Sequence, residues 1–206
     1  MPSNFVQQID RIVSKLSNAN DPLPGQSVSS GTGAVQYGGQ VGARVCLGND
    51  DIAIVNSSSP TLYGGIYQYV QFFLTATKAS VAGLLAFWQT DSTYIVTNDE
   101  PTGCSDIAGI CLNAVSKGNY GWIQIAGKAT VQYRAVLTKT TPAVGDLVIA
   151  AALGSVTPGV VDIIADATNI TSVQLRSAIG IVVGTAPAFP GGGLGTVRLR
   201  FTSYNF

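Results

Sequence analysis

Short apolar runs separated by turn-forming residues dominate the chain from about residue 43 onward. The runs are rich in Val, Ile, Thr, Tyr and Phe, and clusters of Gly, Asn, Asp, Ser and Pro lie between them. This alternation is typical of strands joined by turns. It predicts strands over 43–47, 52–56, 66–75, 81–89, 93–97, 108–114, 121–126, 129–136, 146–151, 160–164, 178–183 and 195–201. So many short strands indicate an all-β body, either a single β-barrel or a β-sandwich.

Individual runs add detail to this prediction. Residues 67–74 alternate imperfectly, which predicts a strand with most of both faces covered, whereas residues 197–201 alternate apolar and basic side chains, as a half-exposed strand does. Ala, Val and Leu also cluster over 78–87, where a second short helix is a weaker alternative to a strand. Gly191–Gly193 is a loop before the last strand, and no Lys-Ser/Thr follows it as in a phosphate-binding loop.

The first 42 residues follow a different pattern. Their apolar positions Phe5, Ile9, Ile12 and Leu16 are spaced 4, 3 and 4 apart, which draws one stripe along a short N-terminal helix. A free helix below about 12–15 residues is marginal in water, so the stripe must dock on its own domain, on sister copies or on a neighbouring protein. Pro, Gly and Ser then dominate as far as residue 42, which predicts an extended arm, with an ordinary flexible leader as the equal alternative. We therefore divide the chain into a helix and arm over 1–42 and a β-rich body over 43–206.

Charge is scarce along the whole chain. Lys and Arg number 11, Asp and Glu also number 11, and charged residues make up 11% of the sequence, against about 25% in average domains. A polar but nearly neutral surface cannot follow a phosphate backbone, so no nucleic-acid partner is expected. Such a surface suits packing against copies of itself or another subunit. An ordinary low-charge soluble protein is the alternative.

The cysteines indicate a reduced protein. Cys46 and Cys111 lie in apolar runs, which predicts small buried hydrophobes, and Cys104 can pair with Cys111 only if the fold brings them together. An odd number of cysteines without a zinc spacing is typical of assembly in the cytoplasm. No apolar run approaches the roughly 18 residues that span a bilayer, and the N-terminus lacks a signal-peptide pattern, so no membrane partner is expected.

Candidate chemistry is sparse. The chain has no histidine, which excludes the usual Ser–His–acid and Cys–His arrangements and removes the commonest metal ligand. The adjacent carboxylates Asp50–Asp51 and Asp99–Glu100 lie in turn-like contexts, where Asp and Asn are favoured for backbone reasons. A glycosidase pair or a calcium site there is a minor alternative. We expect no enzyme activity, no catalytic residue, no cofactor and no metal.

Aromatic residues allow two interpretations. At strand spacing they are more often core and cross-strand packing residues than a sugar-binding platform, and packing is the favoured interpretation. The set comprises Trp88, Trp122, Tyr63, Tyr67, Tyr69, Tyr94, Tyr120 and Tyr133.

One long stretch carries a family resemblance. Residues 108–135 read AGICLNAVSKGNYGWIQIAGKATVQYRA, which predicts a strand, a tight turn at 117–119, a strand, a turn at 127–128 and a strand. This order resembles the core of phage head decoration (cement) proteins. The likeness continues through the turn at 142–148 and the glycine-flanked strand at 177–184 to the closing strand at 195–201. It covers residues 108–201, about half of the chain.

The resemblance implies a structural virion protein. Such a protein forms a homotrimer on the outer surface of the phage capsid, binds the major capsid protein and stabilises the shell. It is made in the host cytoplasm. The N-terminal stripe of Phe5, Ile9, Ile12 and Leu16 then becomes the candidate capsid or trimer contact. A receptor- or glycan-binding module of a phage tail or fibre is the second hypothesis, and a polysaccharide-degrading enzyme is a distant third.

Overall fold

The computed structural model contains only strands and connecting segments over the residues that it describes. These are residues 42, 44–48, 63–72, 80–90, 94–98, 107–112, 114–135, 138–139, 142–151, 159–164, 177–184 and 192–200. None of the described segments is a helix, and none can therefore cross a membrane as one. The all-β prediction is confirmed.

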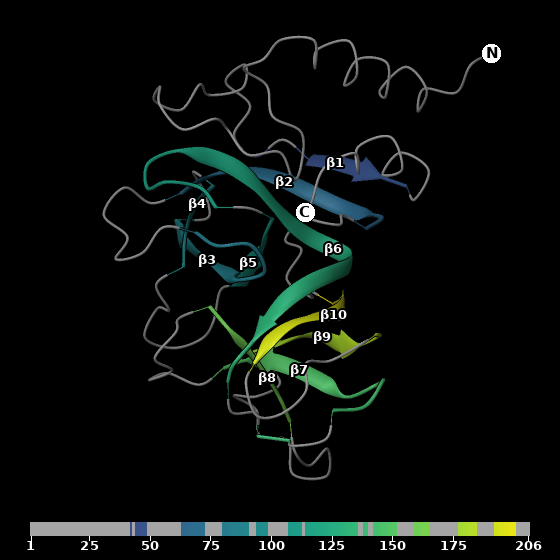
Figure 1. Cartoon of the computed structure of the whole chain (residues 1–206). Coiled ribbons are helices and arrows are strands. Elements are labelled where there is room, and N and C mark those ends of the chain that lie inside the picture. The colour runs from purple at the N-terminus through teal and green to yellow at the C-terminus, as the bar shows by residue number, and fades with distance from the viewer. Residues whose placement is uncertain are drawn as a thin grey trace, which may run out of the picture.

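Ten strands make up the body (Figure 1). Most of them are rich in β-branched or aromatic residues, which pack well on a pleated surface. In chain order they are β1 (Arg44–Leu47), β2 (Gly65–Phe72), β3 (Leu85–Thr90), β4 (Ile95–Thr97), β5 (Ile107–Cys111), β6 (Tyr120–Tyr133), β7 (Leu147–Ala150), β8 (Val161–Ile163), β9 (Ala178–Val182) and β10 (Gly193–Leu199).

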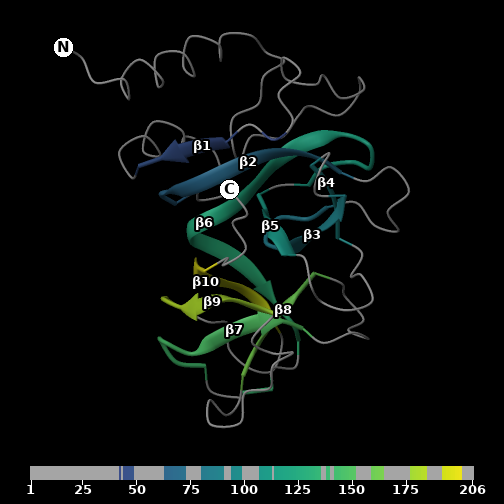
Figure 2. The same cartoon turned by 180° about the vertical axis from the view of Figure 1, so that it is seen from behind.

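The long strand β6 organises the sheet. Its first half pairs with β2 and β5, and its second half pairs with β10 and, at Tyr133, with β8. Gly127 lies at the change of partners, opposite Gly65 of β2 on one edge and Leu199 of β10 on the other. Figures 1 and 2 show β6 running from the group β1–β5 into the group β7–β10. One strand therefore joins both halves of the body.

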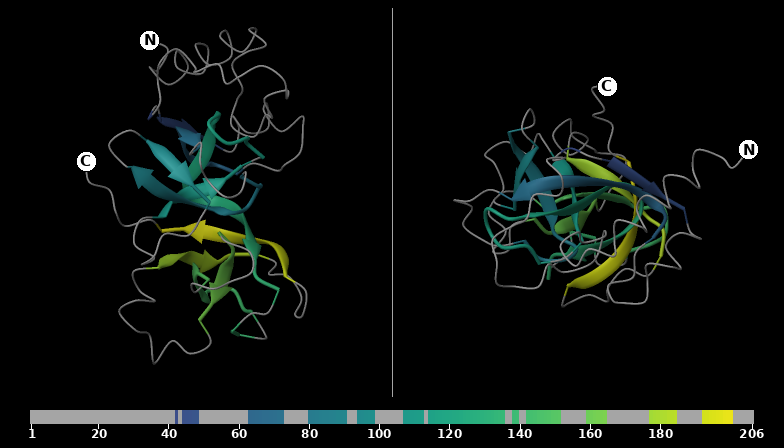
Figure 3. Two further views of the ribbon diagram at one scale, coloured as in Figure 1. Left: turned by 90° about the vertical axis from the view of Figure 1, so that its left-hand side faces the viewer. Right: turned by 90° about the horizontal axis from the view of Figure 1, so that it is seen from above.

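Strand pairing runs round each half in a circuit. The first circuit is β2–β4–β3–β5–β6–β2 and the second is β6–β10–β9–β7–β8–β6. Short parallel pairings complete them, at Gln71–Phe72 with Ile95–Val96 in the first and at Tyr133 with Val161 in the second. The left view of Figure 3 shows the two groups one above the other. The body is thus one mixed sheet that curls into two barrel-like halves without a complete ladder around either.

β3 and β5 lie between two apolar cores. Leu85 and Phe87 of β3 belong to the larger core with the second circuit, while Ala86 and Trp88 face the smaller core inside the first. Continuous apolar runs are expected where both faces of a strand are buried. The turn before β3 also binds both neighbouring strands, since Gly83 donates its N–H to the Cys111 carbonyl of β5 and its own carbonyl accepts from the Gln132 N–H of β6. β3 and β5 consequently contribute side chains to the cores of both halves.

Two predicted turns have different outcomes. The turn at 117–119 is confirmed, and Gly118 there has φ +77°. The turn at 127–128 is wrong, because β6 continues through it as a single strand instead of forming a hairpin of 121–126 with 129–136. Gly127 adopts φ +97°, and its missing side chain lets β6 pass against Gly64, whose oxygen lies 2.3 Å from where a Cβ would stand.

The last strand of the chain follows the predicted alternation. In β10, Val197 and Leu199 are buried while Arg198 and the following Arg200 are exposed. The described part of 78–87 is a turn followed by β3, so the weaker helix alternative is wrong there. The predicted strand at 52–56 lies outside the described residues, as do the N-terminal helix and the arm up to residue 41.

Candidate functional site

The first described residue marks where the predicted arm enters the body. Gly42 donates its N–H to the Tyr69 carbonyl at 2.7 Å, and its own carbonyl accepts from the Gln68 side chain at 3.4 Å. Gly42 has φ +91°, and a Cβ there would lie 2.4 Å from the Tyr94 ring. Only glycine combines this conformation with so close an approach. The chain is therefore held against β2 and Tyr94 at this junction.

Tyr94 has an unusual backbone at the same place. It is the one described non-glycine residue with a positive φ, at +54°, and its side chain is 36% exposed. Its carbonyl accepts from the Gln71 N–H at 3.1 Å, and its ring meets Trp88 edge-on with centroids 6.1 Å apart. An outlier held in place by its surroundings is a reason to look for function. We therefore treat the arm junction, defined as Gly42, Trp88 and Tyr94, as a candidate contact surface.

Most of the other aromatic residues pack within the body. Tyr67, Tyr69 and Tyr133 are buried, and the Tyr69 ring stacks on Tyr120 and lies 5.1 Å from the Trp122 ring. The Tyr67 hydroxyl donates to the Tyr63 carbonyl, and burial raises the pKa of Tyr67 well above its usual range. The packing interpretation is confirmed for the three buried tyrosines.

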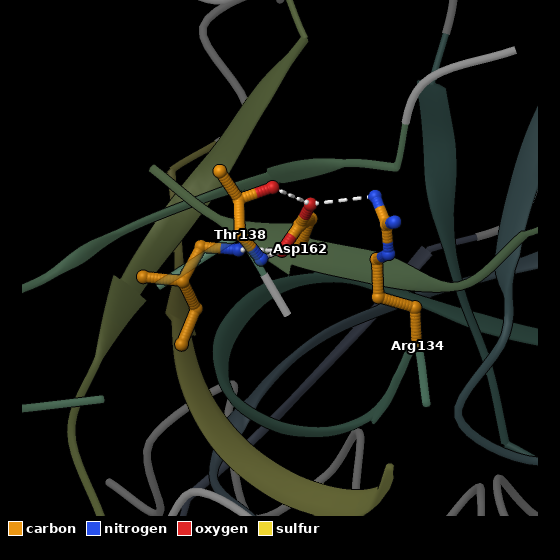
Figure 4. Close-up of polar contacts among 4 residues, drawn as sticks. Arg134, Thr138 and Asp162 are labelled. Carbon is orange, nitrogen blue, oxygen red and sulfur yellow. Dashed lines mark hydrogen bonds and ion pairs between the residues drawn. The ribbon is translucent and has the colours of Figure 1, made fainter. Parts of the chain in front are cut away.

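A buried carboxylate fixes the chain after β6. Asp162 of β8 is 3% exposed and accepts from the Arg134 guanidinium at 2.9 Å, from the Thr138 N–H at 2.9 Å and from the Thr138 hydroxyl at 2.5 Å (Figure 4). It also accepts from the N–H of Ile163 at 2.8 Å. A buried charge is tolerated when it is paired and fully hydrogen-bonded. Asp162 therefore ties the end of β6 to β8, where the second circuit has only one residue pair.

A second ion pair holds the turn before β7. Asp146 accepts from the Lys139 ammonium at 2.6 Å and from the Ala143 N–H at 2.7 Å. The carboxylate thus caps the predicted 142–148 turn, in which Gly145 has φ +94°. Both described carboxylates are occupied by structural contacts, and we assign neither of them to catalysis.

The two described cysteines have opposite environments. Cys111 is buried, and its sulfur accepts from the Asn98 amide at 3.2 Å. Burial raises the pKa of the Cys111 thiol to about 12. The prediction that Cys46 is also buried is wrong: it lies on β1, which among the described strands pairs with β2 alone, and its side chain is exposed. Cys104 lies outside the described residues.

Several predicted positions receive no structural test. Phe5, Ile9, Ile12 and Leu16 lie outside the described residues, as do both adjacent carboxylate pairs, Asp50–Asp51 and Asp99–Glu100. Within the described ranges, no group of three or more His, Cys, Asp or Glu side chains is arranged to hold a metal ion.

Sequence reasoning overlooked two polar sites. The Asp162 network had a visible signal, because a single carboxylate within the apolar run 160–164 must find partners when the run is buried. Tyr94 had no such signal, since its positive φ depends on contacts with β2 and Gly42 that the local sequence does not record.

Comparison with known proteins gives a distant likeness. No family model and no curated protein sequence matches this chain. Among solved structures, the chain is similar to the head fiber gp8.5 N base of bacteriophage phi29, with 14% identity and a TM-score of 0.40 over 65% of this chain and 92% of that chain. A likeness this distant assigns no function, so function is inferred from the residues of this chain.

Proposed function

We propose that this chain is a structural protein of a phage virion, a decoration or cement protein on the outer surface of the capsid. Its body forms homotrimers, and its N-terminal helix and arm lie across major capsid proteins and stabilise their shell. It needs no cofactor and performs no catalysis.

The main support for this proposal is the arrangement of the strands that form from the residues with the sequence resemblance. β5, β6, β10, β9 and β7 come from residues 107–199 and are consecutive neighbours in the sheet order. The stretches that resemble decoration proteins therefore fold as one continuous part of the sheet. Scattered strands would have argued against reading them as a unit.

The arm junction supports the division into attachment segment and body. Gly42 is bound on both sides by β2, and the Tyr94 ring covers its α-carbon. Because Gly42 is firmly held, the arm starts from a defined place on the body. This lowers the entropy that is lost when the arm binds a partner.

Attachment to empty capsids tests the proposal. The full chain and a variant lacking residues 1–40 are mixed with capsids of the cognate major capsid protein, sedimented and quantified in the pellet. We expect trimers by light scattering, saturable binding by the full chain and weaker binding by the truncation, whose circular dichroism remains that of a folded β protein. A full-length variant carrying Ile9→Ser and Ile12→Ser tests the apolar stripe separately, because it keeps the length of the chain and removes two apolar side chains of the stripe. A monomer that does not bind capsids would refute the proposed function, and a truncation that binds as tightly would refute the role of the arm.

A receptor- or glycan-binding module of a tail or fibre is the second candidate. The specific observation in its favour is the partly exposed Tyr94 ring beside Trp88, since aromatic faces bind sugars. Binding on a glycan array that is lost in Tyr94→Ser would support this function over decoration. We favour decoration because Tyr94 already packs against Gly42 and Trp88.

A further inference from the structure

The outer face of β10 carries a segregated pattern of side chains. Leu194, Thr196, Arg198 and Arg200 follow one another at alternate positions, and the first of them is 57% exposed. At about 3.3 Å per residue this row is about 20 Å long. It is apolar at one end and basic at the other, and Lys128 of β6 adds a third cation.

Two of the cations are direct neighbours across the sheet. Arg198 is paired in register with Lys128, and both side chains are exposed. Side chains directly opposite each other in an antiparallel pair have Cβ atoms about 5 Å apart, and like charges there are unfavourable. Lys128 is partly compensated, because its ammonium lies 4.3 Å from the centroid of the Tyr63 ring. The positive charges of Lys128 and Arg198 therefore repel each other across the sheet and destabilise this pairing of β6 with β10.

The described counter-charges are used elsewhere. Within the described ranges the carboxylates are Asp146 and Asp162, and they are ion-paired with Lys139 and Arg134 respectively. Neither Arg198 nor Arg200 forms an ion pair with a described residue. In a chain whose total charge is zero, three neighbouring cations that bind no described carboxylate are a marked local excess of positive charge.

We infer that Lys128, Arg198 and Arg200, the basic stripe, form a docking site for an acidic surface of another protein. Carboxylates of the partner would relieve the Lys128–Arg198 repulsion, and an apolar side chain of the partner would cover Leu194. The exposed leucine in the same row favours a protein over a nucleic acid, which would offer phosphates along the whole row. This inference rests on the proposed function for its biological partner: the basic stripe is a second contact of the body with the capsid, in addition to the arm.

Two double variants of the full chain test the inference. Arg198→Gln with Arg200→Gln removes two charges from the basic stripe. Arg44→Gln with Lys117→Gln is the matched control, because it removes two exposed charges elsewhere and gives the same net charge. Fluorescence anisotropy with labelled poly-L-glutamate is the assay, with a single-stranded oligonucleotide and vesicles of anionic phospholipid as competing probes.

We expect the stripe variant to bind poly-L-glutamate roughly three- to tenfold more weakly than the control variant, with the difference lost near 1 M salt. Equal affinity of the two variants, or no binding of poly-L-glutamate, would overturn the inference. Stronger binding to the oligonucleotide or the vesicles would overturn the assignment to a protein partner. Self-association of the unmodified chain that the stripe variant loses would replace the foreign partner by a second copy.

Capsid sedimentation separates this inference from the proposed function. If the stripe variant binds capsids as tightly as the control, the basic stripe is not a capsid contact, while the decoration function stands. If the unmodified chain binds poly-L-glutamate through the basic stripe but never binds capsids, the decoration function fails and the stripe remains an acidic-protein site.

Discussion

Replacing Asp162 with alanine removes the acceptor that joins β8 to the segment after β6. Four donors lose their partner: the Arg134 guanidinium, the N–H and hydroxyl of Thr138, and the N–H of Ile163. Ile163 is fully buried, so its N–H has no route to water and costs about 1–3 kcal/mol when left unpaired. Thr138 is exposed and Arg134 is 34% exposed, so water replaces their contacts at a smaller cost, together about 1–2 kcal/mol. We expect Asp162→Ala to lower the free energy of unfolding by about 3 kcal/mol.

Related variants fix the order of effects. Arg134→Ala removes one partly exposed ion pair and leaves three hydrogen bonds to Asp162, so its cost is at most about 1 kcal/mol. Asp162→Asn keeps an acceptor for the N–H groups of Thr138 and Ile163. Its loss of unfolding free energy should therefore lie between those of the other two variants, at about 1–2 kcal/mol. Asp146→Ala removes an exposed turn cap and an ion pair, for about 1 kcal/mol.

Urea unfolding measures all four variants. The fluorescence of Trp88 and Trp122 follows the transition, and unchanged slopes against urea allow the free energies to be compared. A loss below about 1 kcal/mol for Asp162→Ala, or equal losses for Asp162→Ala and Arg134→Ala, would refute the view that a buried acceptor fixes this junction. In that case the single residue pair between β6 and β8 would be sufficient without Asp162.

Three further predictions concern closely packed or buried residues. Gly127→Ala places a Cβ 2.3 Å from the Gly64 oxygen at φ +97°, and we expect a loss of at least about 2 kcal/mol in urea unfolding. In a Cys104→Ser background, an aromatic disulfide reagent should label Cys46 within the mixing time and Cys111 only after unfolding; equal rates would contradict the burial of Cys111. Burial raises the pKa of Cys111 to about 12, so the unfolded chain loses this proton first. The contribution of Cys111 to the free energy of unfolding is then fully present below about pH 8.5 and falls towards pH 12 by up to about 1.4 kcal/mol per pH unit. Cys111→Ala should make the free energy of unfolding less dependent on pH in this range.

The sequence predicts most strands because their signal is local. β-branched and aromatic runs bounded by turn formers place the strands other than β6 within a few residues of where they lie. The continuous apolar character of β5 also agrees with its burial on both faces. These features need no knowledge of the partner strands.

The wrong predictions concern residues whose structure depends on the neighbouring strands. Gly127–Lys128 has the composition of a turn, yet β6 continues there because Gly65 and Leu199 pair with Gly127 from either edge. Cys46 lies in an apolar run, but β1 has β2 as its single partner among the described strands, and the Cys46 side chain is exposed. Both outcomes depend on residues at least 19 positions away along the chain, which local periodicity cannot record.

The change of partners along β6 also sets the order in which this protein can fold during synthesis. The first half of β6 pairs with β2, which leaves the ribosome earlier, but the second half needs β10, whose residues 193–199 come last. At about 5–20 residues per second, the second half of β6 waits roughly 3–13 s for its partner. Such distant pairing makes refolding slow. A chain cut before residue 193 keeps one edge of β6 open to strands of other chains, and aggregation is its expected fate.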